Sequence, residues 1–175
     1  GRLLHGARAS KWHSEAFDAF CEHQRPRHGQ RLRELPAALL YRQPRQPVAV
    51  ALQPLYPGIT AGQLRGVLDS GVAALLLECY GSGTGPADDP QMLAVLREAH
   101  ARGVVLAAIS QCPQGSVQFD LYAAGSGLAA CGLVSGVGMS REAALGKLFS
   151  LLGVGLGQAE VERLFGLDLC GELAG

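Results

Sequence analysis

The stretch LLLECYGSGTGPADDP, Leu75 to Pro90, decides the fold. A run of apolar side chains ends in Glu78 and Cys79, and a glycine-rich loop follows. Asp89 before a proline is typical of an N-cap followed by the first residue of a helix. A buried strand, a loop and a helix in this order form part of a βαβ unit. In such units, ligands bind at the loops that follow the carboxyl ends of the strands.

Two more short apolar runs, Val48–Leu52 and Val104–Ile109, accompany the run Val72–Leu77. Uninterrupted apolar runs of this length suit strands that are buried on both faces, as in a parallel sheet. Helix signals separate them, which predicts right-handed βαβ crossovers. The predicted fold class is therefore α/β: a small parallel sheet with βαβ crossovers, covered by helices on both sides in Rossmann-like or flavodoxin-like layers.

Each predicted helix has a recognisable start. Thr60 and Gln63 form a capping box, so a helix should begin near Ala61. A serine or aspartate N-cap and a periodic apolar stripe mark two of the others. The remaining predicted helices are the one that begins at Pro90 and ends at Arg102-Gly103, the one that Ser140 caps and that ends at Gly153, and Gln158 to Phe165.

Composition excludes several classes of protein. With 175 residues and 48% hydrophobic side chains, the chain can form one ordinary core. Fifteen basic and fifteen acidic residues cancel, so no net charge favours nucleic acid or a membrane surface. Five cysteines without a C-x-x-C pair argue against disulfides and a zinc site, and favour reduced thiols in the cytoplasm. No apolar run is long enough to span a bilayer.

The first 46 residues differ in composition from the rest of the chain. Residues 1–22 are predicted to form a short arm in which Trp12, Phe17 and Phe20 make apolar contacts. The polar, basic segment EHQRPRHGQRLRELP that follows is typical of a linker or surface loop. Because the chain begins with Gly rather than Met, it is consistent with a piece of a longer polypeptide.

The loop GSGTGP, Gly81 to Pro86, does not match a nucleotide-binding motif. The dinucleotide fingerprint needs glycine at Pro86, and a phosphate-binding Walker loop needs a lysine. The glycines instead permit a tight turn between strand and helix. Glu78 is less expected, because a carboxylate at the end of a buried run needs a partner. Pairing with an arginine and contact with a ligand both remain open.

The second loop, SQCPQGSVQFD, follows the third predicted strand and contains Cys112 and Ser116. A thiol at a strand end can be activated, but a thiol nucleophile also needs a nearby base such as histidine. Cys112 is therefore interpreted as a small half-buried residue or as part of a pocket lining. An enzyme that uses Cys112 as a thiol nucleophile is a further possible function.

Four segments together resemble the C-terminal domain of type I (cytoplasmic-type) L-asparaginases, a family with bacterial members and larger vertebrate members. They are LLLECYGSGTGP, ARGVVLAAISQCPQGSV, LYAAGSGLAACGLVSGVGMSREAALGKLFSLLG and LCGELAG. The opening GRLLHGARASKWHSEAFDAF is similar to the segment that closes the family's N-terminal domain. The resemblance implies three parts: residues 1–22 as the tail of the N-terminal domain, 23–46 as a linker and 47–175 as the C-terminal α/β domain.

The resemblance implies hydrolysis of asparagine to aspartate and ammonia by the whole protein. In the family, a threonine in a T-G-G-T motif attacks the amide, assisted by a threonine in a T-D-T motif and by a lysine. The two threonines of this chain, Thr60 and Thr84, lie in neither motif. We therefore expect no catalytic residue here and no activity of this chain alone. Its expected partners are the missing N-terminal asparaginase domain and, in the full protein, a second subunit of a homo-oligomer.

The resemblance also implies which residues lie near ligands. Glu78, Tyr80, Ser82 and Thr84 would form a loop that flanks the active site of a neighbouring subunit, where a small amide or amino acid binds. Cys112 and Ser116 are candidates for an allosteric pocket, although Glu78 stands where some bacterial members have an arginine. No cofactor or metal is implied. The alternative function is a non-catalytic, regulatory α/β module that binds a small metabolite.

Overall fold

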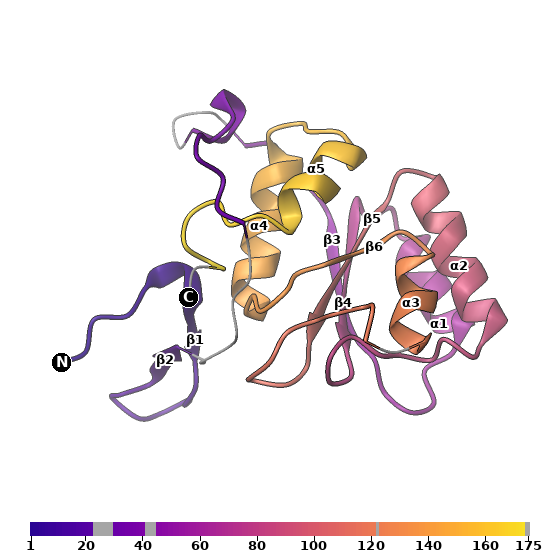
Figure 1. Cartoon of the computed structure of the whole chain (residues 1–175), viewed down its shortest axis with the longest axis horizontal. Helices are drawn as coiled ribbons and strands as arrows, with labels where there is room; N and C mark the ends of the chain where they lie inside the picture. Colours follow the sequence, from indigo (N-terminus) through magenta and orange to yellow (C-terminus); the bar gives the residue numbers. More distant parts are fainter. Residues whose placement is uncertain (23–29, 41–44, 122, 174–175) are drawn as a thin grey trace.

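The computed structural model describes residues 1–22, 30–40, 45–121 and 123–173. Its centre is a four-stranded sheet in the order β3-β4-β5-β6, and all three strand pairs are parallel. The strands are β3 Val50–Pro54, β4 Ala74–Cys79, β5 Val105–Ser110 and β6 Leu133–Ser135. Helices cover both faces of this sheet (Figure 1). The predicted α/β class is thus confirmed.

The two central strands are apolar along their whole length because each face contacts a helical layer. All six residues of β4 and all six of β5 are buried. Successive side chains of a strand point to opposite faces. Leu75 and Leu77 accordingly pack into one core cluster, and Ala74 and Leu76 into the other. The absence of polar alternation in the sequence therefore reports burial on both faces.

Helices α1 Ala61–Leu68, α2 Pro90–Ala101 and α3 Ala123–Ala129 lie on one face of the sheet (Figure 1). The predicted capping box at Thr60 and Gln63 is present, with both reciprocal hydrogen bonds. Asp89 accepts backbone hydrogen bonds from the first turn of α2. Helix α3 was not predicted, because its sequence AAGSGLA has glycines and little apolar periodicity.

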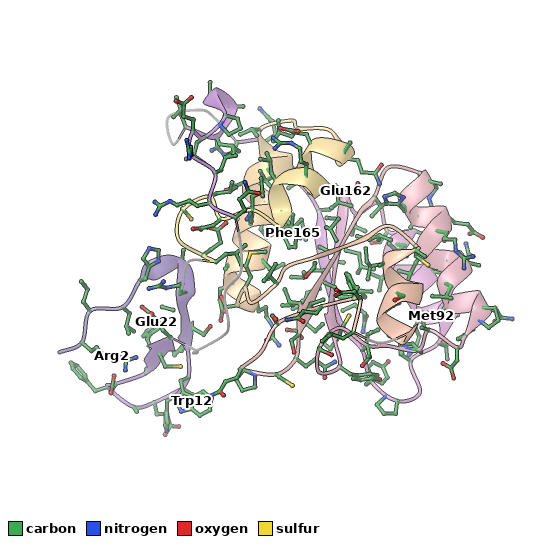
Figure 2. The ribbon with its side chains drawn as sticks, in the orientation of Figure 1. Arg2, Trp12, Glu22, Met92, Glu162 and Phe165 are labelled. Carbon is green, nitrogen blue, oxygen red and sulfur yellow. The ribbon has the colours of Figure 1, made fainter. Side chains whose placement is uncertain are left out.

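Helices α4 Arg141–Gly153 and α5 Gln158–Phe165 cover the opposite face (Figure 1). The Ser140 hydroxyl accepts a hydrogen bond from Ala143, as expected of an N-cap. Phe165, the last residue of α5 and labelled in Figure 2, is fully buried in the core cluster that these helices form with the sheet. Both helices begin and end as the sequence predicts.

The described residues before position 41 include four short elements: η1 Gly6–Arg8, β1 Ala9–Lys11, β2 Phe20–Glu22 and η2 Ala37–Leu39. Strands β1 and β2 make a separate antiparallel hairpin, on the side of the first turn of α4 in Figure 1. The expectation that three aromatic residues make apolar contacts was wrong for Phe17, which is fully exposed, and Trp12 and Phe20 are covered only in part. The predicted linker, residues 23–46, falls partly on residues 23–29 and 41–44, which lie outside the described residues.

Candidate functional site

The candidate site lies where parallel strands β3, β4 and β5 end side by side. Pro54 pairs with Glu78, and Glu78 pairs with Ile109 in the sheet register. Because the carboxyl ends of these strands align, the loops that follow β4 and β5 leave the sheet next to each other. The two loops singled out in the sequence are therefore brought together.

The glycine-rich loop after β4 is closed by its own backbone. The amide of Tyr80 donates to the Thr84 carbonyl over 2.9 Å, and the amide of Thr84 donates back over 3.0 Å. Gly83 has a φ of +111°, and a Cβ there would lie 2.7 Å from Val117 Cγ1. The Thr84 hydroxyl points to the Tyr80 carbonyl at 3.4 Å. Glycine is needed here for backbone conformation and close approach, as the sequence indicates.

Hydrogen bonds join this loop to the one after β5. Ser110 Oγ donates to the Gly81 carbonyl over 2.6 Å, and the Gln118 amide donates to the Ser82 carbonyl over 2.8 Å. Gln111 Nε2 donates to the carbonyl of Glu78 over 2.8 Å. The two loops therefore form one unit with little freedom to separate.

Glu78 is paired with an arginine. Its side chain is 4% exposed, and its carboxylate accepts two hydrogen bonds from Arg141, at 2.6 Å from Nε and 2.9 Å from the terminal nitrogen. These hydrogen bonds raise the pKa of the Arg141 guanidinium. The sequence left open whether Glu78 pairs with an arginine or contacts a ligand, and the structure contains the arginine pair. The sequence did not single out Arg141, because the approach of the α4 N-terminus to the end of β4 is a tertiary contact.

A cavity of about 290 Å³ surrounds this ion pair. Three segments line it: Ser10 to Trp12 of the hairpin, the ends of β4 and β5, and the first turn of α4. Side chains of both charges occur on its walls: the basic Lys11 and Arg141, and the acidic Glu78 and Glu142. Such a cavity suits a small polar molecule that carries both charges.

The other predicted site residues lie around this cavity rather than on its walls. Among the described residues that line it, Glu78 is present but Tyr80, Ser82 and Thr84 are not. Cys112 is exposed, and its backbone amide donates to Ser110 Oγ over 3.0 Å. Ser116 is buried, and its hydroxyl accepts a hydrogen bond from Gln118. Within the described ranges, no group of histidine, cysteine or carboxylate side chains is arranged to hold a metal ion.

A larger cavity, of about 390 Å³, lies between α4, the segment around η2 and the C-terminal turn. Four leucines line it, as do Lys147 and Glu172, which form an ion pair. The loops that follow β4 and β5 do not line this larger cavity. The smaller cavity, which the ends of β4 and β5 do line, is therefore the candidate site. In the described part of the chain, no helix has the length and apolarity that a membrane crossing requires.

With a parallel sheet and paired loops at its strand ends, the chain belongs to the Glutaminase/Asparaginase C-terminal domain family, whose model matches residues 49–165. Its relatives place it with the type I asparaginases. It is 36% identical to L-asparaginase 1 of Escherichia coli K12 over 182 residues, which cover 98% of this chain and 54% of that protein. It is 42% identical over 125 residues to the human 60 kDa lysophospholipase, covering 71% of this chain and 22% of that protein.

Solved structures agree with this placement. The crystal structure of L-asparaginase I from Vibrio cholerae superposes with a TM-score of 0.83 at 32% identity, covering 99% of this chain and 55% of that one. The L-asparaginase from Thermococcus kodakarensis gives a TM-score of 0.78 at 26% identity. The chain thus spans about half the length of the asparaginases that it matches.

Proposed function

We propose that this chain is the C-terminal part of an L-asparaginase-type amidohydrolase that converts asparagine and water to aspartate and ammonia. In this proposal the chain completes the fold, forms part of a subunit interface and flanks an active site whose nucleophile lies in the other half of the polypeptide. The boundaries 1–22, 23–46 and 47–175 belong to the same proposal.

The observation that carries this proposal is the local use of both threonine hydroxyls. Attack on an amide requires an activated hydroxyl, a proton relay and an oxyanion site. Thr60 Oγ1 accepts the Gln63 amide hydrogen bond that caps α1. Thr84 Oγ1 points to a carbonyl of its own loop. Lys147 is paired with Glu172, 2.5 Å from Nζ to Oε1. These residues serve the fold, which supports a nucleophile outside this chain.

Complementation tests the proposal. The part of E. coli L-asparaginase 1 that does not align with this chain is co-expressed with it, and ammonia release from asparagine is measured. We expect release by the complex, and none when the threonines of the T-G-G-T segment of the added half are replaced by valine. A folded complex that releases no ammonia would contradict the proposal. Light scattering of the active complex then measures whether it is a homo-oligomer.

A second candidate function is favoured by the 290 Å³ cavity. Basic side chains, Lys11 and Arg141, and acidic ones, Glu78 and Glu142, line it, which suits an amino acid, whose carboxylate and ammonium groups are attached to the same carbon atom. As a metabolite-binding module, the chain alone would bind asparagine or aspartate with saturation in a calorimetric titration. Arg141→Gln should abolish binding, and Arg163→Gln, an exposed arginine of α5, should not. Absence of binding heat at millimolar amino acid excludes this candidate.

A further inference from the structure

The larger cavity, of about 390 Å³, has the size of a ligand-binding pocket. It lies between α4, the segment around η2 and the C-terminal turn, which runs beside α4 in Figure 1. Ligand pockets commonly have volumes of about 300–1,000 Å³, with mostly apolar walls and a few polar groups. The cavity shares one lining residue, Glu142, with the smaller cavity at the strand ends. It is therefore a second place where a small molecule fits.

Small residues of α4 create this space. Ala143, Gly146 and Ser150 line the cavity and follow one another at intervals of three and four positions, which places them on one face of the helix. Apart from the backbone of the helix itself, a Cβ atom at Gly146 would have no atom of the described residues within 4 Å. Glycine weakens a helix relative to alanine. Neither helix formation nor packing among the described residues therefore accounts for Gly146, and its effect is to keep the cavity open.

Much of the remaining wall is apolar. Leu35 and Leu39 line the cavity from the segment that precedes the sheet, Leu151 lines it from α4, and Leu169 from the C-terminal turn. Leu35 is 42% exposed. Removing apolar surface from water is favourable. An apolar ligand that covers these leucines would therefore gain binding free energy from the contact.

The charged side chains on the wall balance one another. Lys147 and Glu172 form a buried ion pair. The other two charged lining residues, Arg45 and Glu142, are of opposite sign. A ligand with a net charge would lose its hydration on entry and would meet a like charge as well as an opposite one. The wall therefore favours an uncharged ligand.

One polar group on the wall is available to such a ligand. Ser150 Oγ has no hydrogen-bond partner among the described residues. A serine hydroxyl both donates and accepts hydrogen bonds without carrying a charge. It therefore suits an alcohol, whose hydroxyl has the same two capacities.

We propose that this cavity binds an uncharged aliphatic alcohol, with its chain against the four leucines and its hydroxyl on Ser150. At about 30 Å³ for each water-sized group, 390 Å³ holds roughly thirteen such groups, enough for a chain of about eight to ten carbons and its hydroxyl. This site goes beyond the proposed amidohydrolase function, and its test does not use ammonia release.

Calorimetric titration of the chain with octan-1-ol tests this site. We expect saturable one-to-one binding. Hexan-1-ol should bind about tenfold more weakly, because it buries two methylene groups fewer. Octanoate and octylamine have comparable chains and charged heads, and each should also bind at least about tenfold more weakly than the alcohol.

Variants of α4 locate the bound alcohol. Gly146→Leu fills the cavity and should lower the affinity for octan-1-ol by more than about tenfold. Gly66→Leu, on α1 where a Cβ also has open space, is the matched control and should bind normally. Circular dichroism should show that both variants are folded, because leucine forms helix better than glycine. Ser150→Ala removes one hydrogen bond and should weaken binding by about threefold to tenfold.

Three results overturn the inference. They are the absence of saturation up to the solubility limit of octan-1-ol, binding of octanoate or octylamine as tight as that of the alcohol, and unchanged binding by a folded Gly146→Leu variant. If Gly146→Leu does not fold, equal affinities of Ser150→Ala and the parent chain overturn it instead.

The same titration applies to a joined protein, in which the unaligned half of E. coli L-asparaginase 1 precedes Gly1. We expect the joined protein to bind octan-1-ol as the chain alone does. Loss of binding there would assign the cavity to the added half and would also overturn the inference.

Discussion

Lys147 of α4 and Glu172 of the C-terminal turn form an ion pair in which Nζ and Oε1 are 2.5 Å apart and both side chains are 4% exposed. Lys147 also donates to the carbonyl of Leu167. The Glu172 carboxylate accepts the backbone amides of Leu169 and Cys170. One pair thus fixes the C-terminal turn against α4.

Lys147→Met should destabilise the chain strongly. The substitution keeps much of the apolar volume but leaves the buried Glu172 carboxylate without its cation, which costs about 3–5 kcal/mol in the free energy of unfolding. Urea unfolding followed by circular dichroism measures the loss. Arg163→Met breaks the exposed pair with Glu160 and should cost far less, because solvent screens both charges. Equal losses of unfolding free energy in the two variants would show that the buried pair stabilises the chain no more than the exposed pair does.

Acid should destabilise the chain through the same residue. Burial alone raises the pKa of the Glu172 carboxyl, but the hydrogen bond and charge of Lys147, together with hydrogen bonds from backbone amides, outweigh burial and lower that pKa to about 2. A pKa below the unfolded value means that the folded state binds the proton less readily than the unfolded state. Its contribution to stability is present above about pH 4.5 and is lost as the pH falls toward 2.

Glu172→Gln should flatten the dependence of unfolding free energy on pH between about 2 and 4.5, because no carboxyl then titrates at this position. Denaturant titrations at several pH values in this window measure it. Glu160→Gln, at an exposed carboxylate, is the control. An unchanged slope in Glu172→Gln would be the opposing result.

Arg141→Leu should destabilise the strand-end site. Glu78 stays buried, and removing the guanidinium leaves its carboxylate without both side-chain hydrogen bonds. Because Arg141 is half exposed, we expect a loss of about 2–3 kcal/mol in unfolding free energy, below the full cost for a buried pair. Arg141→Lys should recover part of the loss, since lysine keeps the charge but not the two-point geometry. Equal stability of the leucine variant and the parent chain, measured by urea unfolding, would be inconsistent with this pairing.

Two glycines provide a matched test of the loop conformation. Gly83→Ala should destabilise the chain by about 1–3 kcal/mol, because φ is +111° and the new Cβ would meet Val117. Gly66→Ala, at an exposed position in α1 with open space around it, should stabilise the helix by about 0.5–1 kcal/mol. Thermal unfolding of both variants distinguishes the two cases, and a neutral Gly83 variant would remove the proposed requirement for glycine.

The elements that the sequence predicts well are those with local signals. Caps at Thr60, Asp89 and Ser140 define helix starts without reference to the rest of the chain. Strand ends were less accurate, because apolarity reports burial and not pairing. Val48 and Val72 were included although they precede the ladder, whereas Pro54 and Glu78 were omitted although they pair with each other.

The missed elements depend on tertiary contacts. Strand β6, Leu133–Ser135, has three residues, and its identity comes from pairing with β5. Hairpin β1–β2 likewise has strands of three residues, too short for a periodic pattern. In the candidate site, the sequence indicated both loops and the unusual Glu78. It could not indicate Arg141, which α4 brings across the sheet from 63 residues away.

The central claim is that the hydroxyl that attacks asparagine lies outside this chain. The most direct measurement is ammonia release from asparagine by the purified 175-residue chain, compared with the same chain joined to the unaligned half of E. coli L-asparaginase 1. We predict no release above buffer by the chain alone and turnover by the joined protein. Turnover by the chain alone that is lost in Thr84→Val would contradict the claim.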